Sequence, residues 1–340
     1  MKSDQLTGHL PSSVFMGLKE IPENLTKDQI LGVVKYTTEC ADPTAESGYP
    51  ELSIHMVNSP NDGFAEVWTT DQPVESGEHN GIAYSHDGTY LLCTARIAPS
   101  TNYTAQTRTA YTDALDLMAS LDYRKCFRMW NFVSDINGYN SRGLEIYRDF
   151  CQGRAEAFEQ FDLDECKLPA ATGIGSLGGG IAFYLLASKT DLTTPIENPN
   201  QMAAYRYPKR YGPKSPKFAR ATHITSGDPN RPRGQIYVAG TASIRGHETL
   251  HRGDVESQCH LALENIAHVI GSENLSTYGI EPGRELSELR NIKVYVRHDE
   301  DVETVRKICA DAFATDVEIA FMNVDICRSD LLVEIEGIVP

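Results

Sequence analysis

The sequence predicts an α+β protein made of two pseudo-symmetric halves, each a mixed β-sheet with helices packed on one face. Three observations support this fold class: two strand-like segments of similar sequence, an amphipathic helix after each of them, and a matching series of later elements. In both halves the order is strand, helix, strand, helix, strand, strand, as expected for a tandem repeat.

The first strands of the two halves align closely. YLLCTARIA (residues 90–98) aligns with IYVAGTASI (residues 236–244), so that Cys-Thr-Ala-Arg-Ile matches Gly-Thr-Ala-Ser-Ile. After each strand, apolar residues recur at i, i+4, i+7 and i+11, which is the spacing of one helix face. These residues are Ala110, Ala114, Leu117 and Leu121 in the first half, and Cys259, Leu263, Ile266 and Ile270 in the second.

The later elements repeat as well. A second strand is predicted at FRMWNFVSDI and at IKVYVRHDE, and the second helices end in RAEAF and CADAF. The two closing strands are ATGIGSL and GIAFYLLAS in the first half, and VEIAFMNVDI and DLLVEIEGIV in the second. We expect the closing strands of one half to lie near the sheet of the other.

The repeat also predicts domain boundaries. We expect an N-terminal domain over residues 1–200, which includes an N-terminal extension, and a C-terminal domain over residues 221–340. Residues 201–220 form a junction between them. Within the extension, the segment GVVKY predicts one more strand, covering the edge of the first half.

The composition is that of a globular protein, with 41% apolar and 23% charged residues. The formal net charge of -16 argues against nucleic-acid and membrane-surface partners, which require clustered Lys and Arg. It allows an anionic small molecule bound at a locally basic site. No apolar run approaches the roughly 18 residues of a membrane span, and residues 1–17 lack the pattern of a signal peptide. Eight cysteines without CxxC spacing predict reduced thiols in a cytoplasmic protein.

Two short motifs suggest cofactors, but their context argues against both. GIGSLG (residues 173–178) matches a dinucleotide fingerprint, yet a strand-like segment follows where the fingerprint requires a helix, so we predict a hairpin. HETLH (residues 247–251) matches a zinc-protease motif, yet Gly246 and Gly253 bracket it, so we predict a loop followed by a helix with Asp254 as its N-cap. We expect no nucleotide or metal cofactor and no obligate protein partner.

The closing strand of the chain carries two acidic residues between apolar ones. Side chains alternate along a strand, so Glu334 and Glu336 share one face with Ile338. The opposite face, which is core, consists of Val333, Ile335 and Val339. The acidic face either meets solvent or lines a pocket, and the pattern alone leaves both open. The closing strands of the first half contain no acidic residue, and this asymmetry favours a chemical role.

Two segments supply cationic and aromatic side chains. In EIYRDFCQGRAEAF, Tyr147, Cys151 and Arg154 recur at i, i+4 and i+7 and share one helix face. That face is either an ordinary helix edge or an anion site, because Arg binds carboxylates through two hydrogen bonds. The junction segment YRYPKRYGPKSPKFARA combines three prolines, three tyrosines and six basic residues. It predicts a stiff, electropositive crossover, which is compatible with substrate binding.

The second half, from about residue 221, resembles the YjgF family of reactive-imine deaminases. The matching segments are IYVAGTASI, DVESQCHLALENIAHVI, IKVYVRHDE and VEIEGI. This resemblance implies two tandem YjgF-like domains, of the chorismate-mutase-like barrel type, with an active site in the cleft between them. The whole chain resembles the chorismatases more specifically, through YRYPKRYGPKSPKFARA, GTASIRGHET and DICRSDLLVEIEG.

The chorismatase resemblance implies an enzyme that acts on chorismate without a metal or nucleotide. It implies that Glu334 is the general acid that protonates the enolpyruvyl methylene. Such an acid must keep its proton near neutral pH, and burial among apolar residues raises a carboxyl pKa. Gly240 and Cys327 resemble the branch of the family that forms 3-hydroxybenzoate and pyruvate. The role of Glu336 stays open between orienting a neighbour and reaching solvent.

The same resemblance implies the residues that bind the substrate. Its two carboxylates require cations and tyrosines, for which we expect Arg220 and Tyr211 from the junction, and Arg154, Tyr147 and Cys151 from the helix. The ring would be cradled by Thr241 and Ser243. Three alternatives remain: hydrolysis of chorismate to 3,4-dihydroxycyclohexa-1,5-diene carboxylate and pyruvate, an imine or enamine deaminase, and a ligand-binding barrel without catalysis.

Overall fold

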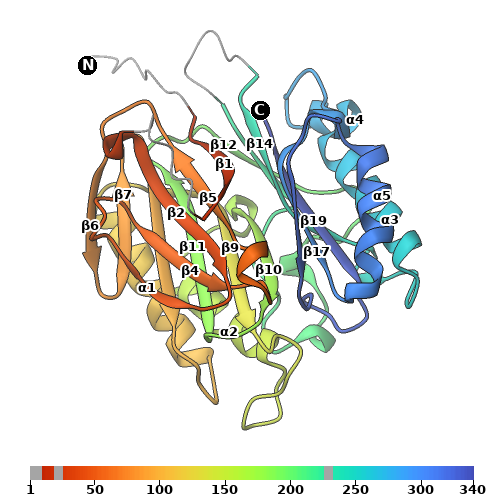
Figure 1. Cartoon of the computed structure of the whole chain (residues 1–340), viewed down its shortest axis with the longest axis horizontal. Coiled ribbons are helices and arrows are strands. Elements are labelled where there is room, and N and C mark those ends of the chain that lie inside the picture. Colours follow the sequence, from red (N-terminus) through yellow and green to blue (C-terminus); the bar gives the residue numbers. More distant parts are fainter. Residues whose placement is uncertain (1–9, 19–25, 226–232) are drawn as a thin grey trace.

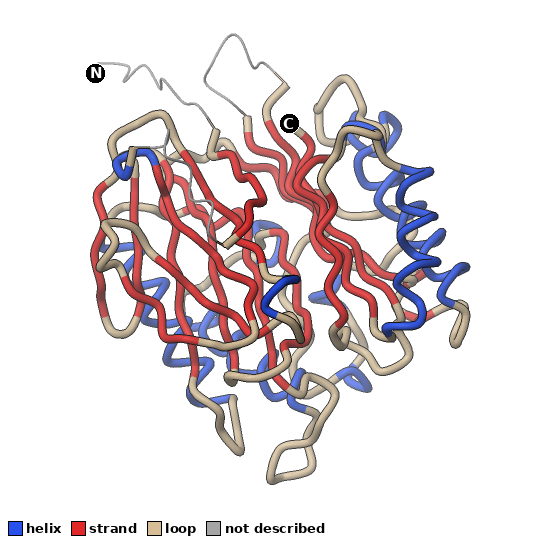
Figure 2. Tube along the Cα trace, in the orientation of Figure 1, coloured by secondary structure: helices blue, strands red, loops and turns tan. Residues whose placement is uncertain are grey.

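The computed structural model describes residues 10–18, 26–225 and 233–340 (Figure 1). Three sheets of five or six strands form the interior, and the long helices lie outside them (Figure 2). The predicted absence of a signal peptide concerns residues 1–17, of which residues 1–9 lie outside the described residues. No helix in the described ranges is long and apolar enough to cross a membrane.

The first half forms a six-stranded mixed sheet in the order β10-β9-β11-β8-β7-β6. Its β9 and β10 run parallel, and β11 pairs antiparallel with both β8 and β9. The elements are β6 (Glu75–His79), β7 (Ile82–His86), β8 (Tyr90–Ile97), α1 (Thr104–Ser120), β9 (Lys125–Ser134), α2 (Ile146–Gln160), β10 (Ala170–Ser176) and β11 (Ile181–Ser188).

The second half repeats this arrangement in the order β18-β17-β19-β14-β13-β12. Its β17 and β18 run parallel, and β19 pairs antiparallel with β14 and β17. The α+β fold class and the order of elements in both halves are therefore confirmed. The elements are β12 (Thr193–Ile196), β13 (Ala221–Ile224), β14 (Gln235–Ala242), β15 (Ile244–Arg245), β16 (Glu248–Thr249), α3 (Val255–Ile270), α4 (Ser272–Ser276), β17 (Arg290–Val296), α5 (Val302–Ala312), β18 (Ile319–Asn323) and β19 (Val333–Val339).

The N-terminal extension forms a separate five-stranded sheet, in the order β1-β5-β2-β4-β3. The predicted strand GVVKY is confirmed and lies at the centre of this sheet, in β2. It does not pair with an edge strand of the first half, but packs on β7 next to that edge, where the Ser85 hydroxyl donates to the Leu31 carbonyl. Because the N-terminal segment contains five strands, these strands pair with one another and form a separate sheet. They are β1 (Ser12–Gly17), β2 (Ile30–Thr37), β3 (Ala41–Thr44), β4 (Glu51–His55) and β5 (Phe64–Thr69).

This N-terminal sheet has the same core topology as the two halves. Strand β2 runs parallel to β4 and antiparallel to β5, and β5 pairs antiparallel with β1. The strands β1, β2, β4 and β5 thus correspond in chain order, pairing and direction to β8, β9, β10 and β11. The extension is a third copy of the strand pattern from which the two long helices are missing. The chain therefore contains three related sheets.

The helix-free faces of the three sheets meet in one apolar core. Tyr36 and Trp68 of the N-terminal sheet pack there with Trp130, Tyr237 and Tyr295 of the two halves. The ring centroids of Trp68 and Trp130 are 5.5 Å apart. The outer faces of the two halves pack on their own helices in two further cores, and Figure 1 shows α3 and α5 on the outer side of β17 and β19.

The face of β19 that carries the acidic residues points into the interior. Val333, Ile335 and Val339 belong to the core under the helices, as predicted. Glu334 and Glu336 lie on the opposite face and are 4% and 1% exposed. The interpretation of this face as solvent-exposed is therefore excluded, and the carboxyls are buried where the sheets meet.

The two cofactor-like motifs adopt non-helical structure. GIGSLG covers the end of β10 and the start of the loop that leads to β11. These two strands do not pair, because β9 lies between them in the sheet. The predicted strands are confirmed and the hairpin is wrong. HETLH contributes β16 (Glu248–Thr249), the second strand of the small β15–β16 hairpin, and the turn residues on either side of it. As predicted, the next helix starts after Asp254, whose Oδ1 accepts a hydrogen bond from the Ser257 N–H at 3.0 Å.

Candidate active site

The candidate site is a cavity of about 220 Å³ between the first and second halves. Its walls come from β10 and α2 of the first half, β14 and β19 of the second, and the junction segment. The two halves are joined at this point by an antiparallel bridge between Ile174 and Ile326, and by a hydrogen bond from the Gly175 N–H to the Asp325 carbonyl at 2.8 Å. As expected for the tandem repeat, the closing strands of one half lie beside the other.

Glu334 lies on the wall of this cavity, at the start of β19. Burial raises the pKa of its carboxyl to about 8, and the nearby negative charge of Glu336 adds to the effect. The positive charges of Arg220, Arg128 and Arg328 lower the pKa of Glu334, but by less than burial and Glu336 raise it. At neutral pH the side chain therefore holds a proton that it can donate, which is the state that a general acid needs.

Gly240 and Cys327 flank the Glu334 carboxyl. The thiol of Cys327 lies 4.0 Å from Glu334 Oε2, and burial raises the pKa of this thiol, so that it stays neutral. A β-carbon at position 240 would overlap Glu334 Oε1 and would lie 3.0 Å from Thr172 Cγ2. Only a glycine leaves space for the carboxyl in its present position. Both of the other residues predicted as catalytic thus lie against the Glu334 carboxyl.

Arg154 presents a buried guanidinium to the cavity from α2. It lies 5.1 Å from the ring centre of Phe150, and no carboxylate in the described part of the chain forms an ion pair with it. Its Nε has no hydrogen-bond partner there. An uncompensated buried cation is costly unless an anion completes the site. Arg154 is therefore well placed to bind an anionic ligand.

Arg220 forms a second cationic group on the wall. Its Nη2 donates to the Met202 carbonyl at 2.9 Å and to Tyr207 Oη at 2.8 Å, while its Nε lies 4.0 Å from Glu197 Oε2. Burial raises the pKa of Glu197 to about 7 despite the nearby guanidinium. These hydrogen bonds to Met202 and Tyr207 fix the orientation of Arg220, whose charged guanidinium group borders the cavity.

Arg328 is a cavity residue that the sequence reasoning did not select. Its guanidinium stacks 4.2 Å from the ring centre of Tyr211, and its Nη1 donates to the His247 carbonyl at 2.9 Å. The hydroxyl of Tyr211 donates to the same carbonyl at 2.6 Å. The β15–β16 hairpin thus holds the junction against the cavity. The position of Arg328 directly after Cys327 was the available signal.

Three of the predicted substrate-binding residues do not line the cavity. Thr241 points away from it because β14 alternates, and its hydroxyl donates to the Ala239 carbonyl at 2.9 Å. The hydroxyl of Ser243 donates to the Leu250 carbonyl at 3.1 Å. Cys151 is buried in the first-half core, where burial raises its pKa to about 11. Tyr147 and Tyr211 do line the cavity, together with both predicted arginines.

Comparisons with known proteins agree with this site. The family model for the N-terminal part of FkbO/Hyg5-like chorismatases matches residues 66–187. A 3-hydroxybenzoate synthase from Streptomyces hygroscopicus is 56% identical over 91% of this chain and 91% of its own length. A chorismatase from Streptomyces rapamycinicus is 45% identical over 92% of this chain and 93% of its own length.

The fold comparison gives the same answer. A crystal structure of a chorismatase matches with a TM-score of 0.93 and 41% sequence identity, covering 97% of this chain and 98% of the other. Sequence identity above 40% over nearly the full length of both proteins, together with the common fold, defines a family relationship. This chain belongs to the chorismatase family.

Proposed function

We propose that this chain converts chorismate to 3-hydroxybenzoate and pyruvate, with Glu334 as the general acid. The observation that carries the proposal is the buried, protonated Glu334 carboxyl, which shares one cavity with the guanidinium groups of Arg154 and Arg220. The relative named 3-hydroxybenzoate synthase supports this branch of the family. We also propose, from the scattered cysteines, a cytoplasmic location. The predicted domain boundaries are proposed as well, with β12 (Thr193–Ile196), which lies before residue 201, contributing an edge strand to the sheet of the C-terminal domain.

The cations of the cavity match the charge of the substrate. Chorismate carries one carboxylate on its ring and one on its enolpyruvyl group. Arg154 and Arg220 would each bind a carboxylate, with Tyr147 and Tyr211 as hydrogen-bonding neighbours. Because Arg154 has no carboxylate partner of its own in the described chain, substrate binding completes a charge pair rather than breaking one.

The proposed reaction begins with proton transfer to carbon. The Glu334 carboxyl gives its proton to the terminal methylene, whose double-bond electrons form the new C–H bond and leave an oxocarbenium ion. The neighbouring ring hydroxyl then attacks the carbon that bears the ether, and the C–O bond breaks to release pyruvate. The proton lost by this hydroxyl restores the Glu334 carboxyl. The resulting epoxide-like intermediate isomerises to the phenol, so no water is consumed.

Gly240 and Cys327 support this intramolecular route over hydrolysis. Hydrolysis needs a water molecule beside the ring, whereas the glycine lets the ring lie deep against Glu334. The neutral thiol of Cys327 is a weak polar neighbour for the epoxide-like species. The hydrolytic route remains the alternative that the product analysis must exclude.

Product analysis tests the proposal directly. The purified, EDTA-treated protein is incubated with chorismate, and the products are separated by chromatography and identified by mass spectrometry. We expect pyruvate and 3-hydroxybenzoate in equal amounts. Pyruvate with a non-aromatic dihydroxy acid would assign the chain to the hydrolytic branch. Intact chorismate would contradict both routes and leave a deaminase or a ligand-binding barrel.

A second experiment separates catalysis from binding. Glu334→Gln keeps the size of the side chain but cannot donate a carboxyl proton. We expect turnover to fall by about three orders of magnitude, in the usual range of acid–base catalysis, while chorismate binding measured by calorimetry stays within threefold. Turnover similar to that of the unmodified protein would remove Glu334 from the mechanism.

A further inference from the structure

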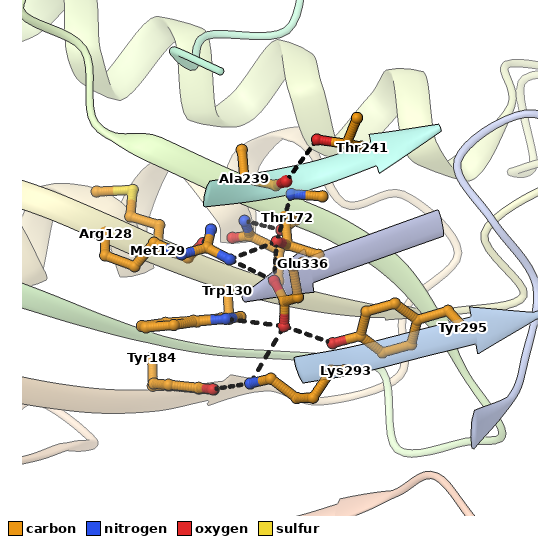
Figure 3. Close-up of polar contacts among 12 residues, drawn as sticks. Arg128, Met129, Trp130, Thr172, Tyr184, Ala239, Thr241, Lys293, Tyr295 and Glu336 are labelled. Atoms are coloured by element: carbon orange, nitrogen blue, oxygen red, sulfur yellow. Dashed lines mark hydrogen bonds and ion pairs between the residues drawn. The ribbon is translucent and has the colours of Figure 1, made fainter. Parts of the chain in front are cut away.

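Glu336 lies two residues beyond Glu334 on the same face of β19 and is the centre of a buried polar cluster (Figure 3). Its Oε1 accepts hydrogen bonds from Tyr295 Oη at 2.8 Å and Trp130 Nε1 at 3.1 Å, and lies 3.2 Å from Lys293 Nζ. Its Oε2 contacts Arg128 Nη2 and the hydroxyl of Thr172. The carboxylate is therefore held by charged and neutral donors.

The cluster brings the three sheets together around one point. Lys293 also pairs with Glu66 of the N-terminal sheet at 2.9 Å. In the strand registers, Glu336 lies opposite Lys293, Glu66 opposite Val34, and Leu186 opposite Arg128. These are equivalent places in the three related sheets. Two cations and two carboxylates thus balance each other in the interior, and none of them reaches solvent.

The cluster also continues into the floor of the cavity through Thr172. The hydroxyl of Thr172 donates to Glu336, accepts from Arg128 Nη2 at 2.7 Å, and accepts the Gly240 N–H at 3.0 Å. Gly240 is the residue against which the Glu334 carboxyl lies. A continuous chain of contacts therefore joins Glu336 to the backbone beside the general acid.

We propose that Glu336 is a positioning residue for proton transfer: its fixed negative charge, two residues from Glu334 on the same face of β19, disfavours a second negative charge there, and its contact with Thr172 holds the backbone beside Glu334. This inference rests on the proposed role of Glu334 as proton donor. It assigns to the buried cluster a function in the reaction, beyond its contribution to joining the sheets. Glu336 itself does not line the cavity.

The charges around Glu334 support this assignment. Burial opposes the ionisation of Glu336, yet Lys293 and Arg128, with the hydrogen bonds from Thr172 and Tyr295, hold its pKa below the usual range. Burial is the main cause of the raised pKa of Glu334, and Glu336 is the negative charge that adds to it. The other ionisable groups that face Glu334 are Arg220 before β13, Arg128 on β9, Tyr147 on α2, and Cys327 and Arg328 before β19.

The test is the pH dependence of a single turnover in the full chain, measured with excess enzyme over chorismate. For the unmodified protein we expect a level rate below pH 7 that falls above pH 8. In Glu336→Gln burial still raises the pKa of Glu334, but no nearby negative charge adds to it and the three arginines still lower it. The fall should therefore begin at least about one pH unit lower. The rate at pH 8, relative to the low-pH plateau, should then drop about tenfold.

A matched variant controls for loss of packing. Tyr295→Phe removes one hydrogen bond to Glu336 but leaves its charge, so the position of the falling limb should not move. If Glu336→Gln does not fold, Glu336→Gln with Lys293→Met removes one anion and one cation together, and the same shift is expected. Met replaces the Lys stem at similar volume, which keeps the core filled.

The outcomes separate this inference from the proposed function. A falling limb that stays in place in both Glu336 variants, with a uniformly lower rate, would overturn the inference and leave Glu336 a structural residue. A pH-independent rate in the unmodified protein up to pH 9, or full turnover in Glu334→Gln, would instead overturn the role of Glu334. A shifted limb in the Glu336 variants and an unshifted one in Tyr295→Phe would support the inference.

Discussion

Glu334 Oε1 occupies the space that a β-carbon at position 240 would fill. The two residues face each other across β14 and β19, next to a register irregularity between Val238 and Thr241. The side chain of the proposed general acid therefore takes its position from the missing side chain of its neighbour. A residue with no functional group of its own thus determines where the proton is held.

The first prediction concerns Gly240→Ala. The methyl group must displace either the Glu334 carboxyl or Thr172, and the end of a glutamate side chain moves more easily than a buried residue that is hydrogen-bonded on three sides. We expect 3-hydroxybenzoate formation to slow at least tenfold and the share of non-aromatic dihydroxy acid to rise. Chromatography of the products from chorismate checks both expectations.

Gly173→Ala provides the matched control. Its added β-carbon would lie 3.1 Å from Tyr147 Cε2 and would narrow the same cavity without touching Glu334. Chorismate affinity should fall, but the ratio of products should not change. The same rise in the share of dihydroxy acid in both variants would show that cavity size, rather than the position of Glu334, determines the product.

The second prediction is a pH-dependent effect of Glu334 on stability. The folded protein binds this proton more tightly than the unfolded chain, since the pKa is about 8 when folded and about 4.3 when unfolded. The contribution to stability is present in full below the unfolded pKa and is lost as pH rises through the folded pKa. Between these values the free energy of unfolding should fall by up to about 1.4 kcal/mol per pH unit.

Glu334→Gln removes this dependence. Chemical denaturation at several pH values should show the variant gaining stability relative to the unmodified protein from pH 5 to pH 8. Glu248→Gln is the control: a hydrogen bond from Arg210 lowers the pKa of the Glu248 carboxyl, so this group titrates below pH 5 in both the folded and the unfolded state, and the stability of its variant relative to the unmodified protein should stay constant from pH 5 to pH 8. A constant difference between Glu334→Gln and the unmodified protein across this range would mean that Glu334 is ionised in the folded state.

The third prediction concerns Arg154→Met. Losing a charge-assisted, bidentate contact costs about 1.5 to 3 kcal/mol, so KM for chorismate should rise roughly tenfold to a hundredfold. The fold should not be weakened, because Met removes an uncompensated buried charge from a site beside Phe150 and Phe158. Steady-state kinetics and thermal melting check the two expectations.

Arg148→Met is the matched control for Arg154. Arg148 also borders the cavity, but Glu145 already pairs with it at 2.7 Å. Its loss should raise KM much less than the loss of Arg154. Comparable effects from both variants would point to general electrostatic attraction instead of a specific carboxylate site.

The sequence predicted the repeat and the alternation of β19 because both depend on local periodicity. Glu334 and Glu336 follow directly from that alternation, and Gly240, Cys327 and Arg220 came from the family resemblance. The helix spacing that selected Arg154 and Tyr147 also selected Cys151, because it cannot tell a cavity from the core behind it. Side chains also alternate along β14, so Thr241 lies on the opposite face from Gly240 and Ala242, which line the cavity. The same rule that identified the acidic face of β19 therefore excludes Thr241 from the cavity.

The N-terminal sheet and the buried cluster could not be predicted in this way. The third copy of the strand pattern has no long helices, so it lacks the amphipathic spacing that marked the other two. Glu66 lies within FAEVWT as an isolated acidic residue, and only the meeting of three sheets brings it to Lys293. Arg128 and Lys293 occupy matching places in the aligned strands FRMW and IKVY, which was the one signal in the sequence.

The last prediction concerns Thr172, whose hydroxyl joins Glu336 to Gly240. Thr172→Val keeps the shape of the side chain and the Cγ2 contact but leaves the Gly240 N–H without its acceptor. The backbone beside Glu334 is then held less firmly, so kcat should fall at least tenfold while KM changes less than threefold. The falling limb of the pH profile should stay in place, because Glu336 keeps its charge. Thr172→Ser restores the hydroxyl and should recover most of kcat; a Ser variant as slow as the Val variant would contradict this role.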